Sequence, residues 1–135
     1  MDSIRLPLIL AGRVLLALMF ILSGFDKLSH LQDTATYFTG VGLPAPMIVA
    51  VLVGLLELLG GLAIATGFKA RLAALVLALF TLGTSLVAHR YWSMPADQQM
   101  VQQLLFMKNL SVAGGLLVLA AMGSGPASLG HSAPR

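Results

Sequence analysis

The stretch that decides the fold is residues 44–67, PAPMIVAVLVGLLELLGGLAIATG, an apolar run with one ionisable residue, Glu57, near its centre. The run exceeds the roughly 20 residues that an α-helix needs to cross about 30 Å of hydrocarbon. A carboxylate at that depth is costly unless it is paired, protonated or turned toward a polar cavity. We therefore expect a membrane-spanning helix whose Glu57 face points into the protein.

Three more apolar segments of similar length accompany this run. The predicted spans are residues 6–28, 45–67, 71–89 and 103–122. The 135-residue chain is 58% hydrophobic and 10% charged, with a mean hydropathy of +0.92, far above that of soluble domains. A soluble helical bundle would need a polar stripe on every helix, and VLLALMFIL at positions 14–22 has none. The sequence therefore predicts an all-α integral membrane four-helix bundle.

The predicted spans define one domain. Residues 1–122 are expected to form a four-span transmembrane domain, and residues 123–135, rich in Gly, Ser and Pro, a flexible C-terminal tail. We expect the first span to be retained, because no small-residue cleavage site follows it and Arg13 lies inside it. The connection at 29–44 is long enough for a short amphipathic segment along the membrane interface.

The composition excludes several classes of function. Cysteine is absent, which removes disulfides, thiolate metal sites and iron–sulfur clusters. The net charge of +3 comes from scattered basic residues and not from a patch, so the bilayer and not nucleic acid is the expected partner. His30 and His89 show no metal-ligand spacing and do not suggest paired haem ligands. We expect no metal site.

The distribution of Lys and Arg predicts the orientation in the membrane. The N-terminus, the second connection and the C-terminus carry four basic residues, Arg5, Lys69, Arg71 and Arg135. The first and third connections carry two, Lys27 and Arg90, accompanied by Asp26, Asp33 and Asp97. Short cytoplasmic segments are enriched in Lys and Arg. Both termini are therefore predicted to be cytoplasmic.

Each predicted span has one small or polar face, as a bundle with a polar interior requires. Small residues let neighbouring helices approach closely, and the candidate packing glycines are Gly24, Gly54, Gly61, Gly114 and Gly115. Counting about 1.5 Å per residue from the cytoplasmic ends, Arg13 lies about 10 Å deep, Glu57 about 15 Å and Lys108 about 21 Å. The long side chains of Arg13 and Lys108 are expected to reach the level of Glu57.

Two interpretations of this cluster remain open. Arg13 and Glu57 can form a buried ion pair that only fixes helix register. Alternatively, Arg13, Glu57, Lys108 and Asn109 line a site for an anionic or carbonyl-bearing ligand, because intramembrane ionisable residues are candidates for function. In that case Glu57 and His89 are the candidates for proton transfer.

A set of motifs in this order resembles the DoxX family of small bacterial inner-membrane proteins. The motifs are AGRVLLALMFILSGFDKL, GLP, GLLELLGGLAIATGFKARLAA, AHRYW, FMKNLSVAGGLL and GSGPASL. The resemblance covers nearly the whole chain and implies a four-helix membrane bundle in the bacterial inner membrane. The family positions that it maps onto this chain are Arg13, Gly24, Lys27, Glu57, His89, Lys108 and Asn109.

The resemblance also implies a class of activity. Relatives include a membrane subunit of a thiosulfate:quinone oxidoreductase and members associated with oxidative stress, while many are described only as membrane proteins. This chain departs from the family at its end, where Ala127-Ser128-Leu129-Gly130 stands in place of a motif of the Ser-Leu-Asp type. The missing acid puts any function of that terminal motif in doubt.

The leading hypothesis is therefore a membrane component of a redox system, with a quinone or similar small ligand in the bundle. Its partners would be redox subunits or further copies of the chain. One alternative is a small proton-coupled carrier that switches at Glu57. Another is a membrane scaffold without catalytic activity, in which ion pairs only hold the helices together.

Overall fold

The computed structural model describes residues 2–129, and all of the long elements are helices. In chain order they are α1 (Asp2–Ser29), α2 (Leu31–Gly40), α3 (Pro46–Thr66), α4 (Ala70–Ala88), the short 3-10 helix η1 (Tyr91–Ser93) and α5 (Ala96–Met122). The predicted all-α class is thus confirmed. The first residue and residues 130–135 lie outside the described part of the chain, so the predicted flexible tail is described only over residues 123–129.

Four of these helices, α1, α3, α4 and α5, are long and apolar enough to cross a membrane. Many of their leucines, isoleucines and valines are exposed on the outer surface, as expected where lipid takes the place of a protein neighbour. The four predicted spans therefore match four helices. The fourth span, residues 103–122, is the apolar part of α5, which continues back to Ala96 through polar residues.

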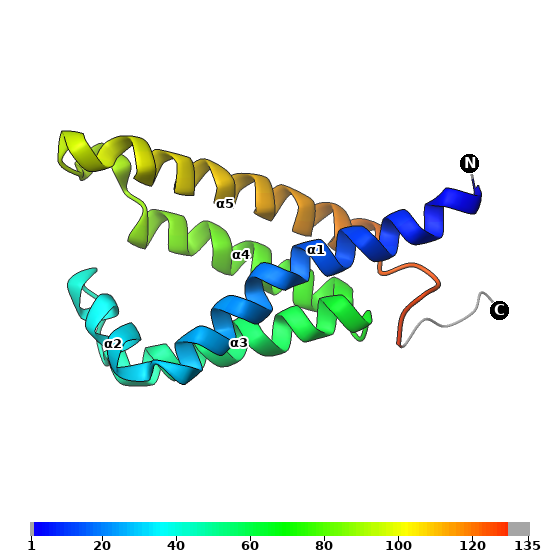
Figure 1. Cartoon of the computed structure of the whole chain (residues 1–135), viewed down its shortest axis with the longest axis horizontal. Coiled ribbons are helices and arrows are strands. Elements are labelled where there is room, and N and C mark those ends of the chain that lie inside the picture. Colours follow the sequence, from blue (N-terminus) through cyan, green and yellow to red (C-terminus); the bar gives the residue numbers. More distant parts are fainter. Residues whose placement is uncertain (1, 130–135) are drawn as a thin grey trace.

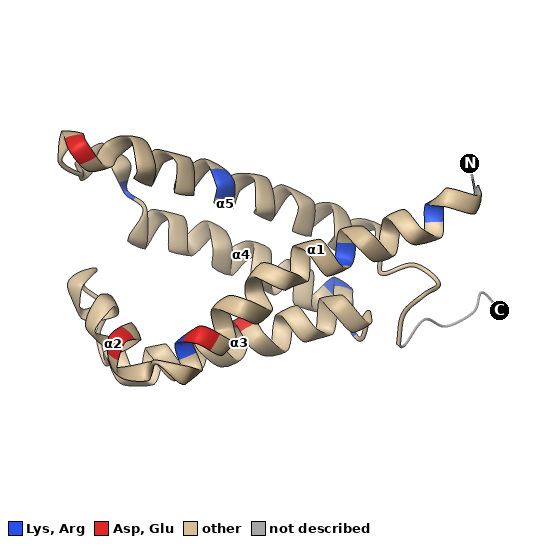
Figure 2. Ribbon diagram, viewed as in Figure 1, with Lys and Arg blue, Asp and Glu red and all other residues tan. Residues whose placement is uncertain are grey.

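The helices are arranged as two pairs, α1 with α3 and α4 with α5 (Figure 1). Helix α3 also packs against α2 and α4. Figure 1 shows the two pairs meeting at the end where both termini lie and separating toward α2 and η1. Figure 2 shows basic segments of α1 and α4 at the end near the termini, and acidic segments of α2 and the start of α5 at the opposite end.

Glycine allows the backbones of α1 and α3 to touch. A Cβ atom on Gly24 would lie 2.7 Å from the carbonyl oxygen of Gly54, and one on Gly61 would lie 3.1 Å from that of Ala17. The pairing is antiparallel, because the end of α1 meets the beginning of α3. This contact without intervening side chains sets the register of the two helices.

The hydrophobic core fills the end where the two pairs meet. It is built from small residues and a few large ones, with Ile64, Leu77 and Leu116 fully buried. Each of these three comes from a different helix. Beyond Phe20 the core ends, and the space between the pairs is not filled by side chains to the same extent.

The connection between α1 and α3 forms the short helix α2, which was predicted as an amphipathic segment. Its Phe38 is buried and turned into the protein, while Tyr37 is half exposed. At the other end of α3, Gly67 and Lys69 both have positive φ, which makes the tight turn into α4.

Candidate functional site

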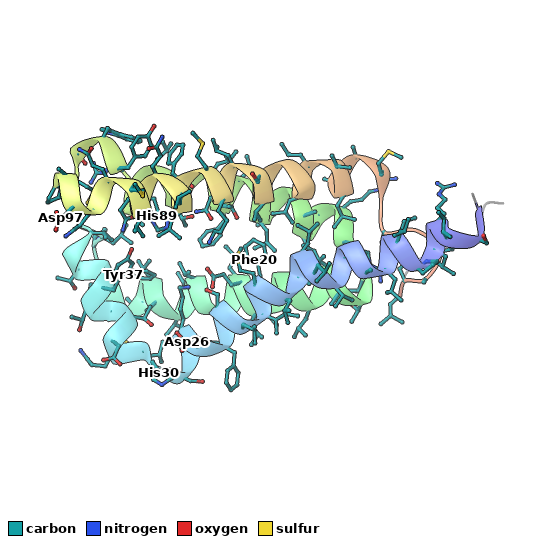
Figure 3. The ribbon with its side chains drawn as sticks, turned by 45° about the horizontal axis from the view of Figure 1, so that its top comes forward. Phe20, Asp26, His30, Tyr37, His89 and Asp97 are labelled. Carbon is teal, nitrogen blue, oxygen red and sulfur yellow. The ribbon has the colours of Figure 1, made fainter. Side chains whose placement is uncertain are left out.

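The end of the bundle where the helix pairs separate contains a cavity of about 580 Å³. All five α-helices contribute to its lining. Figure 3 shows Phe20 of α1 and Tyr37 of α2 on the side that faces α4 and α5, with His89 across from them. A volume of this size is typical of sites for small organic ligands.

Most of the cavity wall is apolar. Phe20, Phe38, Val53 and Phe80 contribute large apolar surfaces from four different helices. Apolar walls with a few convergent polar groups are the usual composition of small-ligand sites. This cavity therefore suits a ligand that carries both an apolar body and a polar group.

The first polar feature of the wall is an ion pair between α1 and α3. Lys27 Nζ lies 3.0 Å from Glu57 Oε2 and 3.3 Å from Glu57 Oε1, and it also donates to Ser23 Oγ at 2.6 Å. The Glu57 side chain is 8% exposed, and that of Lys27 is 22% exposed. The costly intramembrane carboxylate thus has a cationic partner, as its depth requires.

Arg13 occupies a different place from the one predicted. Its Nη2 donates to the carbonyl oxygen of Ala65 at 3.0 Å, and its Nη1 to that of Ser124 at 2.6 Å. The prediction of an ion pair between Arg13 and Glu57 is therefore wrong, because the ion-pair partner of Glu57 is Lys27. Arg13 is buried at the packed end of the bundle and does not line the cavity.

Lys108 and Asn109 of α5 do line the cavity, as does Thr81 of α4. Lys108 was predicted to reach the level of Glu57. Within residues 2–129, however, it forms no ion pair with Glu57 or with any other carboxylate. Thr81 is 3% exposed and its Oγ1 has no hydrogen-bond partner in the described chain. Asn109 is 6% exposed. The cavity lining thus includes one exposed cationic side chain, Lys108, and two buried polar side chains.

His89 stands at the outer end of the cavity. Its Nδ1 lies 2.8 Å from Oε1 of Gln102, so a glutamine of α5 orients the imidazole ring. Beside it, Tyr91, Trp92 and Phe106 form a cluster with edge-to-face contacts. The arrangement leaves the histidine on the lining of the cavity, between the buried groups and the surface.

The segment after α5 lies against the ends of α3 and α4. Arg13 donates to the carbonyl oxygen of Ser124, and Arg71 Nη2 lies 3.4 Å from the carbonyl oxygen of Met122. The backbone amide of Leu129 donates to the carbonyl oxygen of Thr66 at 2.8 Å. Cationic side chains commonly satisfy such carbonyls at helix C-termini. Residues 123–129 are therefore hydrogen-bonded to the bundle.

The predicted packing glycines fall into two groups. Gly24, Gly54 and Gly61 lie in the α1–α3 contact, and Gly115 lies near the side chain of Leu16, where a Cβ would be 3.3 Å away. By contrast, a Cβ on Gly114 would meet no atom within 4 Å of the described chain. Gly114 therefore has no close helix contact within this subunit.

Lys27 and Thr81 are not among the site residues expected from the sequence pattern, although the resemblance marks Lys27 as a family position. The position of Lys27 on the same face of α1 as Gly24 was a signal that it could follow the backbone contact to α3. Thr81 lies in a row of small and polar residues on α4 and carried no distinguishing signal. Among residues 2–129, no group of three or more His, Asp or Glu side chains could hold a metal ion.

Known proteins provide a further comparison. The chain is 36% identical to the inner membrane protein YphA of Escherichia coli K12 over 128 residues, which cover 95% of this chain and 91% of YphA. It is 39% identical to the inner membrane protein YqjF of the same organism over 121 residues, covering 90% of this chain and 88% of YqjF. It also resembles the yeast ER-derived vesicles protein ERV29, at 29% identity over 95% of this chain but only 34% of ERV29.

No solved structure is significantly similar to the chain. The model of the DoxX family matches residues 8–90, which include α1, α2, α3 and α4 with the Lys27–Glu57 pair. The E. coli relatives extend the similarity over nearly the whole chain. The chain therefore belongs to the DoxX family.

Proposed function

We propose that the cavity binds a small amphiphilic ligand of the membrane, and that the protein is the membrane component of a redox system in which this ligand is an isoprenoid quinone. The observation that carries the proposal is the cavity itself. Its apolar wall ends in the convergent polar groups of Lys27, Glu57, Thr81 and Asn109. An apolar chain with a carbonyl-bearing head group fits such a surface.

The polar groups supply the contacts that a quinone head needs. Lys108 and the amide of Asn109 would donate hydrogen bonds to a carbonyl oxygen, and Thr81 Oγ1 is a further donor without a partner in the described chain. Arg13 has no ligand contact in this proposal, because its guanidinium is bonded to helix-end carbonyls instead.

Reduction of a quinone to a quinol takes up two electrons and two protons. In the proposal a separate redox subunit supplies the electrons, because this chain has no cysteine and carries no redox side-chain cluster in residues 2–129. Glu57 transfers a proton within the cavity, and His89 connects the cavity to water at its outer end. The site lies in the inner membrane, where the E. coli relatives are named.

The test is the quinone content of the purified protein. Wild type, Lys108→Gln, Glu57→Gln and Asn109→Leu are purified in mild detergent and extracted with organic solvent, with Lys69→Gln as a control because Lys69 is exposed on the α3–α4 turn. We expect near-stoichiometric quinone in wild type and the control, and loss of quinone in the cavity variants. Quinone at the level of an unrelated membrane protein would refute the quinone proposal.

The Lys27–Glu57 pair favours a second candidate, a small proton-coupled carrier. Protonation of Glu57 would release Lys27, so the charge of the cavity would change with each proton bound. Four spans leave little room for alternating access, and this candidate therefore requires two or more copies. In proteoliposomes it predicts ligand-driven proton movement that Glu57→Gln abolishes. Wild-type behaviour of all these variants would instead indicate a scaffold.

A further inference from the structure

The cavity carries an unbalanced positive charge. Lys27 and Glu57 neutralise each other through their ion pair. Lys108 lines the same cavity, and no carboxylate of the described chain lies within ion-pair distance of its ammonium group. With His89 neutral, the charged groups of the lining sum to one positive charge.

The position of Lys108 makes this charge costly. It lies about 8 Å along α5 from Gln103, where the apolar part of the helix begins, and about 21 Å from Met122, and its side chain is exposed. Its ammonium group is therefore inside the apolar part of the span but within reach of the interface on the η1 side through the open cavity. An ammonium group at this depth needs either water or an anion in the cavity.

Two buried polar side chains on the cavity lining can contact the head group of a ligand. Thr81, 3% exposed, and Asn109, 6% exposed, both line the cavity. Thr81 Oγ1 has no hydrogen-bond partner within residues 2–129, although buried polar atoms are normally paired. Both side chains can donate hydrogen bonds, and both stand on the wall that also holds Lys108.

We propose that a ligand of this cavity carries one negative charge at its polar end, bound by Lys108 with Thr81 and Asn109. Its apolar part lies along Phe20, Phe38 and Phe80. The inference rests on the proposed function only in that the cavity binds a membrane amphiphile. An isoprenoid quinone is uncharged, so the inference adds an anionic amphiphile such as a fatty acid as a second class of ligand for the same cavity.

The experiment compares an acid with its uncharged ester. The full chain is placed in phosphatidylcholine nanodiscs, and binding of decanoate and methyl decanoate is measured by equilibrium dialysis, with empty nanodiscs to subtract partitioning into lipid. A hydrogen-bonded charge pair corresponds to a difference of about tenfold to a hundredfold in affinity. We expect wild type to prefer decanoate by that factor.

The variants assign the preference to Lys108. Lys108→Gln is expected to lose the preference for the acid over the ester, Lys108→Arg to keep it, and the control Lys69→Gln to match wild type. Helical content and elution volume verify folding of each variant. The comparison of decanoate and methyl decanoate binding by wild type tests the inference even if a variant fails to fold. Asn109→Leu provides a second test of the head-group contact.

Three results would overturn the inference: equal binding of acid and ester by wild type, an acid preference that survives Lys108→Gln, or no binding of either probe by folded protein. Different results would refute the quinone proposal and the charge inference. Quinone in the extracts without an acid preference refutes the charge inference alone, and Lys108-dependent decanoate binding without quinone refutes the quinone proposal alone.

Discussion

Lys27 and Glu57 approach each other from opposite directions along antiparallel helices, and their side chains meet at 3.0 Å between Nζ and Oε2. Side chains on an α-helix lean toward the N-terminus of that helix. On α1 this direction takes Lys27 toward the packed end of the bundle, and on α3 it takes Glu57 toward the open end. The two stems therefore converge over the contact between Gly24 and Gly54.

Removing Lys27 alone should destabilise the protein. Lys27→Met leaves Glu57 buried without its cation, and we expect a loss of about 3 kcal/mol, at the low end for a broken buried pair because Lys27 is partly exposed. The double variant Lys27→Met with Glu57→Met should recover at least half of that loss, because it removes both charges. Reversible unfolding in mixed detergent micelles measures the three stabilities. A single variant as stable as wild type would show that the pair contributes nothing.

Loss of Arg13 should free the segment after α5. Arg13→Gln removes the charged donor to the carbonyl oxygens of Ala65 and Ser124. Losing a hydrogen bond to a charged group should cost about 1.5–3 kcal/mol of stability. We expect faster hydrogen–deuterium exchange in residues 123–129. Arg5→Gln serves as the matched control, because Arg5 is exposed near the start of the same helix. Identical exchange in both variants would contradict this role for Arg13.

Gly24 and Gly114 should respond oppositely to the same substitution. Gly24→Ala places a Cβ 2.5 Å from the amide nitrogen of Leu58, and separating the helices should cost about 1–3 kcal/mol. Gly114→Ala meets no atom within 4 Å of the described chain and should be neutral or stabilising by up to about 1 kcal/mol. Thermal unfolding compares the two. Destabilisation by Gly114→Ala would instead place Gly114 in a contact between subunits.

Thr81→Val should separate stability from ligand binding. The substitution removes a buried hydroxyl that has no partner in the described chain and keeps nearly the same shape, so the ligand-free protein should gain about 1 kcal/mol. Ligand retention should fall, since a donor is lost from the cavity wall. Unfolding temperature and ligand content of the same preparation are the measurements. Lower stability together with unchanged ligand content would show that the hydroxyl acts only within the bundle.

The orientation prediction can be tested directly, because the chain has no cysteine. Basic residues in the N-terminus, the α3–α4 turn and the C-terminus predict that both termini face the cytoplasm; they are Arg5, Lys69, Arg71 and Arg135. A membrane-impermeant maleimide should therefore label Ser93→Cys in intact cells and leave Ser3→Cys unlabelled until the cells are lysed. The reverse pattern would invert the topology.

The fold could be predicted because hydrophobic length is a strong constraint in membranes. Four runs near 20 residues leave few alternatives to four helices, and Glu57 indicates which face of the second span is internal. The beginning of α5 lies outside the apolar run, because polar residues such as Gln98 and Gln99 continue the helix back to Ala96. Hydropathy marks the membrane boundary and not the end of the helix.

The candidate site could be predicted only in part, because depth along separate helices does not define contacts. The sequence correctly indicates that Glu57 needs a cation, but the antiparallel register places Arg13 beside Ala65, about 12 Å along the axis from Glu57. The lean of the side chain carries Arg13 still farther away. Only the approach of Gly24 to Gly54 fixes this register, and no single-helix pattern reveals which glycines face each other.

The contact between Arg13 and Ser124 also has a consequence for biogenesis. The two residues are separated by 111 positions, so Arg13 is synthesised well before Ser124. At synthesis rates of about 5–20 residues per second, this acceptor becomes available roughly 5–20 s after the arginine has been made. Its other acceptor, Ala65, is 52 positions away and is made sooner. Arg13 therefore enters the membrane before either of its acceptors has been made. Helix α3 supplies the first acceptor, and the segment after α5 supplies the second only after all four long helices have been synthesised.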